Sequence, residues 1–233
     1  MEGNAGRYAV YFTLEPASAL ARFGAAWLGH DAAADQSVAQ PAVAGIDRER
    51  LQAITAEPRR YGFHATLKPP FALAEGTDAA ELDEAVRAFA GDFPAFAAPP
   101  LRLARLAGFW ALTLSEPCPA MDLLAALCVS ELDRFRAPPP PEEVARRRRA
   151  GLSSAQEALL ARWGYPYVME EFRFHMTLTS RLDGGEGDAV GLALAPLVEP
   201  FCRMPVRIDA LSLFRQDRRD ARFRLLCRYT LAG

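Results

Sequence analysis

Two short segments of the chain share the frame Phe-His-x-Thr-Leu. The first covers residues 63–67 and the second residues 174–178. The chain contains only 3 histidines, and two of them, His64 and His175, lie in these segments. A single His-x-Thr is common, but two copies with matching apolar residues on both sides indicate a shared chemical role.

Each copy alternates as a β-strand does, so its histidine and threonine point to one face and its apolar residues to the other. Imidazole can give or take a proton near neutral pH. The hydroxyl of Thr66 or Thr177 can donate to a phosphoryl oxygen. Two such strands at one cleft would supply a general base, a general acid and an anion cradle, with no metal required.

Further side chains are candidates for contact with a substrate. The alternation predicts three cations on the same faces as the histidines, which can neutralise developing negative charge: Lys68, Arg173 and Arg181. Three more residues are weaker candidates for lining the cleft or stacking on a ring: Tyr11, Arg60 and Tyr61.

Composition narrows the class of protein. The 233 residues are 51% hydrophobic and 24% charged with a formal net charge of −2, so a dedicated duplex-DNA-binding protein is not expected. The 4 cysteines show neither CxxC nor zinc-type spacing and are expected to be reduced thiols. Segment 1–7 lacks the apolar core of a signal peptide, and no apolar run is long enough to span a bilayer. We therefore expect a cytoplasmic protein with no membrane partner.

The order of predicted elements indicates an α+β fold of two pseudo-symmetric lobes around a central cleft, each an antiparallel sheet with flanking helices. The prolines at 138–141 are the expected boundary, giving one bilobal domain over 1–233 with lobes near 1–137 and 142–233 that could exchange strands. Pro69 is expected to end the first histidine strand. Segment 93–100 is expected to be a connector, and segment 30–45, which contains His30, a mobile loop with a solvated histidine.

The paired motifs resemble those of the two-histidine (2H) phosphoesterase superfamily. Residues 60–68 (RYGFHATLK), 163–168 (WGYPYV) and 172–179 (FRFHMTLT) are similar to a bacterial branch named for phosphonate metabolism, after its occurrence among carbon–phosphorus lyase genes. Segment 151–153 (GLS) and Gln156 also fit that branch. The resemblance covers nearly the whole chain.

This resemblance implies a metal-independent attack on a phosphodiester, with no cofactor. His64 and His175 would be the acid–base pair, in either order, and Thr66 and Thr177 would hold the phosphoryl oxygens. The partner would be a small phosphorylated metabolite with a cyclic phosphate. In the setting of the branch this would be a ribose cyclic phosphate released during phosphonate breakdown, although no residue of the sequence identifies the sugar.

Three other interpretations of the motifs stay open. The protein could be an RNA-end or nucleoside 2′,3′-cyclic phosphodiesterase or a ligase-type enzyme, which a continuous basic groove with exposed aromatics would favour. It could bind phosphate esters without turnover. Zinc binding is disfavoured because two histidines need a further ligand, although Glu170 and Glu171 lie just upstream.

Two more features have structural interpretations that we favour over functional ones. The arginine run 146–149 is expected to be a solvated helix face and not an anion-steering patch. The aromatic segment 163–168 is expected to set chain direction at a helix-to-strand turn.

Overall fold

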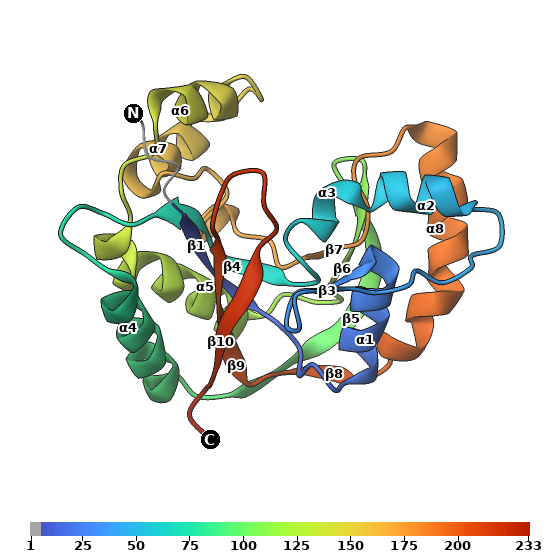
Figure 1. Ribbon diagram of the computed structural model, residues 1–233, viewed down its shortest axis with the longest axis horizontal. Coiled ribbons are helices and arrows are strands. Elements are labelled where there is room, and N and C mark those ends of the chain that lie inside the picture. Colours follow the sequence, from blue (N-terminus) through green and yellow to red (C-terminus); the bar gives the residue numbers. More distant parts are fainter. Residues whose placement is uncertain (1–5) are drawn as a thin grey trace.

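The computed structural model describes residues 6–233 of the chain (Figure 1). Its strands form an eight-stranded sheet and a two-stranded hairpin, and all pairings between these strands are antiparallel. The predicted α+β class is confirmed. Segment 1–7, which we expect not to be a signal peptide, lies mostly outside the described part of the chain, because that part begins at residue 6.

The large sheet has the strand order β10-β9-β1-β4-β7-β6-β5-β8. The strands of its first half are β1 (Arg7–Phe12), β4 (Ala65–Ala72), β9 (Ala210–Gln216) and β10 (Arg224–Thr230). Those of its second half are β5 (Phe96–Leu106), β6 (Phe109–Leu114), β7 (Met176–Thr177) and β8 (Pro205–Ile208). The strands that carry the two histidine motifs, β4 and β7, are the innermost pair, so the halves meet at the motifs.

Each half of the sheet combines early and late parts of the chain. In the first half, β1 pairs with both β4 and β9. In the second half, β6 pairs with β7 and β5 pairs with β8. Each half of the sheet therefore contains strands from before and after segment 138–141.

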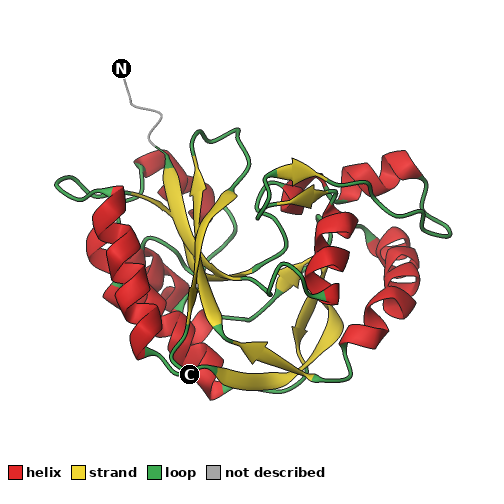
Figure 2. Ribbon diagram, turned by 60° about the horizontal axis from the view of Figure 1, so that its bottom comes forward, coloured by secondary structure: helices red, strands yellow, loops and turns green. Residues whose placement is uncertain are grey.

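Helices pack along both flanks of the curled sheet (Figure 2). The helices are α1 (Ala19–Leu28), α2 (Arg48–Ile54), α3 (Ala56–Arg59), α4 (Ala79–Asp92), α5 (Pro119–Glu131), α6 (Pro141–Arg148), α7 (Ser154–Trp163) and α8 (Gly184–Val198). Short 3-10 turns are η1 (Asp133–Phe135), η2 (Met169–Glu171) and η3 (Glu199–Phe201). Local signals fix several helix starts: Ser18 caps α1, and capping boxes open α4 at Asp78 and α7 at Ser153.

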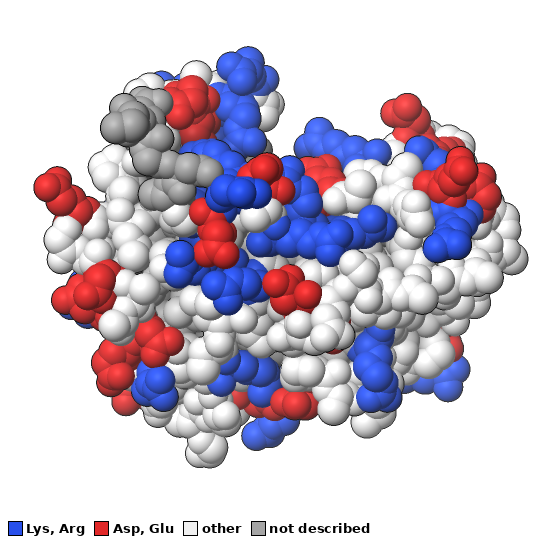
Figure 3. Space-filling view, viewed as in Figure 1, with Lys and Arg blue, Asp and Glu red and all other residues white. Residues whose placement is uncertain are grey.

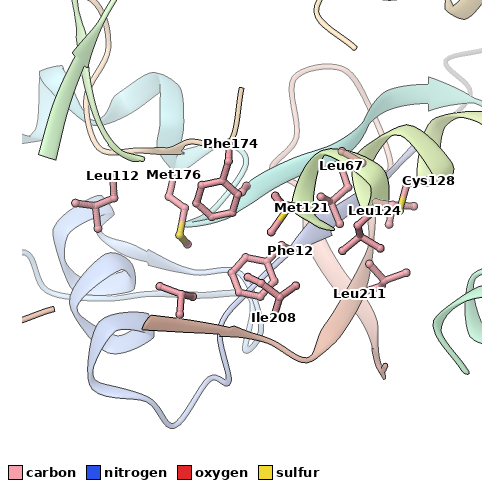
Figure 4. Close-up of a cluster of buried hydrophobic side chains, with 14 of the residues drawn as sticks. Phe12, Leu67, Leu112, Met121, Leu124, Cys128, Phe174, Met176, Ile208 and Leu211 are labelled. Carbon is pink, nitrogen blue, oxygen red and sulfur yellow. The ribbon is translucent and has the colours of Figure 1, made fainter. Parts of the chain in front are cut away.

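The main core lies between the sheet and these helices (Figure 4). Phe12 of β1 and Phe174 beside β7 pack with ring centroids 6.1 Å apart, bridging the two halves. Leu67 of β4 and Met176 of β7 are at most 1% exposed on the same side. Burial of these apolar residues holds the two motif strands together from behind.

The expectation that Pro69 ends the first histidine strand is wrong, because β4 continues to Ala72. Along the β1–β4 ladder, Tyr11 pairs with Thr66, Val10 with Lys68 and Tyr8 with Phe71, so β4 holds two extra residues. Pro69 and Pro70 fall within the second irregularity, where the ladder needs no amide donor from them.

Two other segments also differ from expectation. Segment 93–100 is not only a connector, since β5 begins at Phe96 and pairs with β8. Segment 30–45 contains a hairpin of β2 (His30–Asp31) and β3 (Gln36–Ser37). His30 is not solvated but 1% exposed, with its Nδ1 3.0 Å from the carbonyl oxygen of Gln36. A hairpin this short has no hydrophobic alternation long enough to be recognised.

Candidate active site

The turn before β4 positions His64. Gly62 has φ +77°, and a Cβ there would lie 2.6 Å from the Cβ of Ala32, so both backbone angle and space favour glycine. The turn aims the carbonyl oxygen of Gly62 at Nδ1 of His64, 2.9 Å away. The glycine thereby sets the orientation of the imidazole.

His175 is held in the same way by its own backbone. Its Nδ1 lies 2.7 Å from the carbonyl oxygen of Arg173, which is again two residues earlier. A carbonyl oxygen only accepts, so in both neutral imidazoles Nδ1 carries the proton and Nε2 holds the lone pair. Both motifs therefore present a proton-accepting Nε2.

The register of the motif strands places the four polar side chains on one face. Ala65 of β4 pairs with Met176 of β7, and both are fully buried on the core side. The residues that flank this pair, His64 and Thr66 on one strand and His175 and Thr177 on the other, must therefore face the opposite side. The hydroxyl oxygen of Thr66 lies 3.0 Å from Nε2 of His64 and donates to it.

Burial weakens the basicity of both imidazoles. It lowers the pKa of His64 to about 4, with a further lowering from the charge of His175 and a partial offset from the Gly62 hydrogen bond. Burial also lowers the pKa of His175, offset by the Arg173 carbonyl. Without a bound anion both imidazoles are therefore neutral at pH 7, and a negatively charged ligand would favour protonation.

Aromatic rings enclose the two imidazoles. The ring of Tyr11 stacks on His64 at a centroid distance of 3.7 Å, and Phe109 of β6 lies 5.8 Å from His175. Tyr11 is fully buried, so it does not line the cleft as expected; it lies behind the imidazole. Phe109 could not be predicted from the motifs. It lies two residues before Ala111, the partner of Thr177, and this register places it on the same face of the sheet as Thr177.

A cavity of about 560 Å³ adjoins the site, although His175 and Thr66 are not among the residues that line it. Its walls include His64 and Thr177, together with two of the predicted substrate-binding residues, Tyr61 and Arg181. Arg181 is exposed, and no ion pair among residues 6–233 includes it. It is therefore available to an anionic ligand. Glu57 contributes one carboxylate to the same cavity.

Besides Tyr11, three predicted substrate-binding residues do not line this cavity. Lys68 is 2% exposed and donates 2.9 Å to the carbonyl oxygen of Val129 at the end of α5, with Asp133 3.6 Å away. The extra residue at Leu67 turns it onto the face of Val10, toward the core. Strict alternation fails because the sequence carries no sign of this bulge.

The other two are arginines. Arg173 donates to the carbonyl oxygens of Phe172 (3.0 Å) and Glu170 (3.4 Å) and lines a different hollow, beside Arg102. Arg60 directs its guanidinium to the carbonyl oxygen of Arg219, in the loop between β9 and β10. Both are exposed cations near the site rather than parts of its wall.

Among residues 6–233, no three side chains of His, Cys, Asp and Glu gather in a way that could hold a metal ion. Over the same residues, no helix combines the length and apolar character that crossing a membrane requires.

The family follows from comparison with known sequences. Residues 66–224, about two thirds of the chain, match the family described as "Protein of unknown function (DUF1045)". The chain belongs to this family. It is also 42% identical over 221 residues to a ribose 1,5-bisphosphate phosphokinase PhnN from Janthinobacterium sp. (strain Marseille), and 39% identical over 223 residues to the protein of that name from Laribacter hongkongensis (strain HLHK9).

These alignments cover 93% and 95% of this chain but 49% and 51% of the relatives, so the chain spans about half the length of the curated relatives it matches. Among solved structures, Escherichia coli LigT complexed with phosphate is similar over 99% of this chain and 100% of that chain, with 12% identity and a TM-score of 0.46.

Proposed function

We propose that the protein is a metal-independent phosphodiesterase that opens a small cyclic phosphate ester by acid–base catalysis at His64 and His175. One observation carries the proposal: in both imidazoles Nδ1–H donates to the carbonyl oxygen two residues earlier, which leaves Nε2 available for proton transfer. They do so on neighbouring strands, with a threonine hydroxyl two residues after each. A binding module needs donors but no matched base and acid.

The reaction needs one neutral and one protonated imidazole. Nε2 of the base removes a proton from water, whose oxygen forms a new bond to phosphorus. The ester P–O bond of the ring breaks, and Nε2–H of the acid gives its proton to the leaving alkoxide oxygen. Thr66 and Thr177 donate to the phosphoryl oxygens, and Arg181 offsets their negative charge. The product is a phosphate monoester, and a proton exchange with solvent restores the starting state.

His64 is the better candidate for the base. Its pKa is lowered to about 4, and the Thr66 hydroxyl already donates to its Nε2, so its neutral form is stabilised twice. His175 is then the acid, protonated when the phosphate anion binds. When Thr66 turns its hydroxyl to a phosphoryl oxygen, the lone pair of His64 is freed for water.

The favoured substrate is a ribose cyclic phosphate formed during phosphonate breakdown, whose strained five-membered ester opens to a monoester. The names of the curated relatives, which refer to a ribose bisphosphate, support this choice of sugar. The alternatives are an RNA-end or nucleoside 2′,3′-cyclic phosphate, acted on by a phosphodiesterase or ligase-type enzyme, and binding without turnover.

The test is phosphorus NMR of ribose 1,2-cyclic phosphates and nucleoside 2′,3′-cyclic phosphates incubated with the protein in chelator. Ring opening by the wild type, with the preferred member showing the substrate class, would support the proposal. No turnover of any member, with phosphate esters still bound, would replace it with the binding module.

A further inference from the structure

A group of arginine and tyrosine side chains lies on the β1 side of His64. We call it the arginine–tyrosine wall, and its members are Arg7, Tyr11, Tyr61, Arg147 and Tyr165. The ring of Phe223 joins three of them: its centroid lies 5.6 Å from the guanidinium of Arg7, 5.3 Å from the ring of Tyr61 and 6.1 Å from the ring of Tyr11. The guanidinium of Arg147 lies 4.3 Å from the ring of Tyr165. Tyr61 also lines the cavity with His64, so the wall is continuous with the site.

Arg7 is a partly desolvated cation held in place by an amide. Its Nε donates 2.9 Å to Oε1 of Gln216, which is 1% exposed and gives its own Nε2 protons to the carbonyl oxygens of Arg219 (3.2 Å) and Ala221 (2.8 Å). Burial lowers the pKa of Arg7. None of the ion pairs within residues 6–233 includes Arg7, although the negative charge of Glu143 partly offsets the lowering of its pKa by burial. A half-buried guanidinium usually has an anionic partner.

The wall holds more hydrogen-bond donors than acceptors. The hydroxyl of Tyr11 and Nε of Arg147 are buried and have no hydrogen-bond partner in the described part of the chain. The carboxylate at this place, Glu143, is 8% exposed and already accepts from Arg147 (2.6 Å) and Arg219 (3.3 Å). Buried donors normally have partners. The missing acceptors here are the kind that a phosphate supplies.

The spacing fits a ligand that also reaches the histidines. Arg7 and Tyr11 share one face of β1 and are four residues apart, about 13 Å along a strand, and Tyr11 stacks directly on His64. Because the arginine side chain is long, the guanidinium of Arg7 can lie closer to His64 than its own Cα does, at a distance of about one sugar unit. Figure 3 shows basic side chains, interspersed with acidic ones, across the middle of this face, over the region of the β9–β10 loop.

We propose that the arginine–tyrosine wall binds a second phosphate group of the substrate, one sugar unit from the cyclic phosphate. This inference rests on the proposed function and narrows its substrate class to cyclic phosphate esters that carry an additional phosphate monoester. Arg7 is the residue that binds the second phosphate.

The test compares two ligands that differ only in the second phosphate, adenosine 2′-monophosphate and adenosine 2′,5′-bisphosphate. Calorimetry in chelator at low salt should show the bisphosphate binding about tenfold tighter to the wild type. Arg7→Gln should reduce this advantage to about twofold or less and leave monophosphate binding unchanged. Arg87→Gln, which removes an exposed arginine paired with Asp83 on α4, is the matched control and should retain the advantage.

Equal affinity of the wild type for the two ligands, absence of bisphosphate binding, or equal weakening of both ligands by Arg7→Gln would overturn the inference. If Arg7→Gln fails to fold, Arg7→Lys keeps the charge but loses the bidentate guanidinium and should lower the bisphosphate advantage about threefold; an undiminished advantage would count against the wall. Ring opening is measured separately. Turnover without preference for a 5′-phosphorylated substrate overturns only the inference, whereas a bisphosphate advantage without turnover overturns only the proposed function.

Discussion

The ring of Tyr11 stacks on the imidazole of His64, with centroids 3.7 Å apart and planes 26° apart. Because Tyr11 is fully buried, it shields that side of the imidazole from water and helps to keep the pKa of His64 low. We therefore expect Tyr11→Leu to raise this pKa by about one unit and to lower kcat/KM for ring opening about tenfold. Tyr11→Phe preserves the stack and should leave the pKa nearly unchanged.

NMR titration of the His64 ring signals measures this directly, with the signals of His175 as an internal reference. An unchanged His64 pKa in Tyr11→Leu would show that the tyrosine only fills space.

The motif residues could be predicted from the sequence because each motif carries its own pattern of polar and apolar residues. The pairing of β4 with β7 could not, since β7 contains only Met176 and Thr177 and its partner lies more than a hundred residues away. Alternation in the sequence gives a face for each residue but does not show which strands are neighbours.

The supporting residues were harder to predict for a related reason. Lys68 was misplaced because a bulge reverses alternation. The role proposed here for Arg7 could not be predicted because its environment comes from Gln216 and Phe223, on other segments. Tyr61 and Arg181 were placed correctly because each lies close in sequence to a histidine motif.

The pH dependence follows from the lowered pKa values of the two histidines. The pKa of His64 is lowered to about 4, and the pKa of His175 is lowered below its usual value. In the free protein, the form in which one of the two imidazoles is protonated therefore prevails on the acid side of neutrality. We expect kcat/KM to reach its maximum below about pH 6.5 and to fall as rising pH removes the proton from the acid. A bound phosphate anion raises both pKa values, so the kcat profile should lie at higher pH.

Initial rates across the pH range, at substrate concentrations below and above KM, give the two profiles. A kcat/KM maximum on the alkaline side of neutrality would contradict the assignment of two neutral imidazoles in the free protein.

Two arginines near the second motif provide a matched pair. Arg181 lines the cavity with His64, whereas Arg173 donates to backbone carbonyls and lines a separate hollow. Arg181→Gln should weaken the binding of phosphate monoester products about tenfold, because a charge-assisted contact is lost. Arg173→Gln removes the same charge and should change binding about twofold or less. Calorimetry with one phosphate monoester tests both variants. An equal loss of affinity in the two would mean that the arginines act only through the overall positive charge of the surface.

Lys68, the single lysine of the chain, should be dispensable for turnover. Its ammonium group is buried against α5, which lowers its pKa to about 8, and its partner Asp133 keeps a second ion pair at 2.7 Å with Arg136. Lys68→Met should therefore keep the ring-opening rate within about twofold and change the free energy of unfolding by about 1 kcal/mol or less. Lys68→Glu, which buries a negative charge beside Asp133, should destabilise by about 3 kcal/mol or more.

Urea denaturation and turnover measurements on the two variants distinguish a structural role of Lys68 from a role in ring opening. A large loss of turnover in a stably folded Lys68→Met would return this residue to the site.

The most direct test is the rate of ring opening, in chelator, for the wild type, His64→Ala, His175→Ala and the double variant, with the best cyclic phosphate of the panel. If the two imidazoles act as one acid–base pair, each single change costs about a hundredfold or more, and the double change costs little beyond the larger single loss. Independent losses that multiply in the double variant, or a single variant that retains the wild-type rate, would contradict catalysis by the pair.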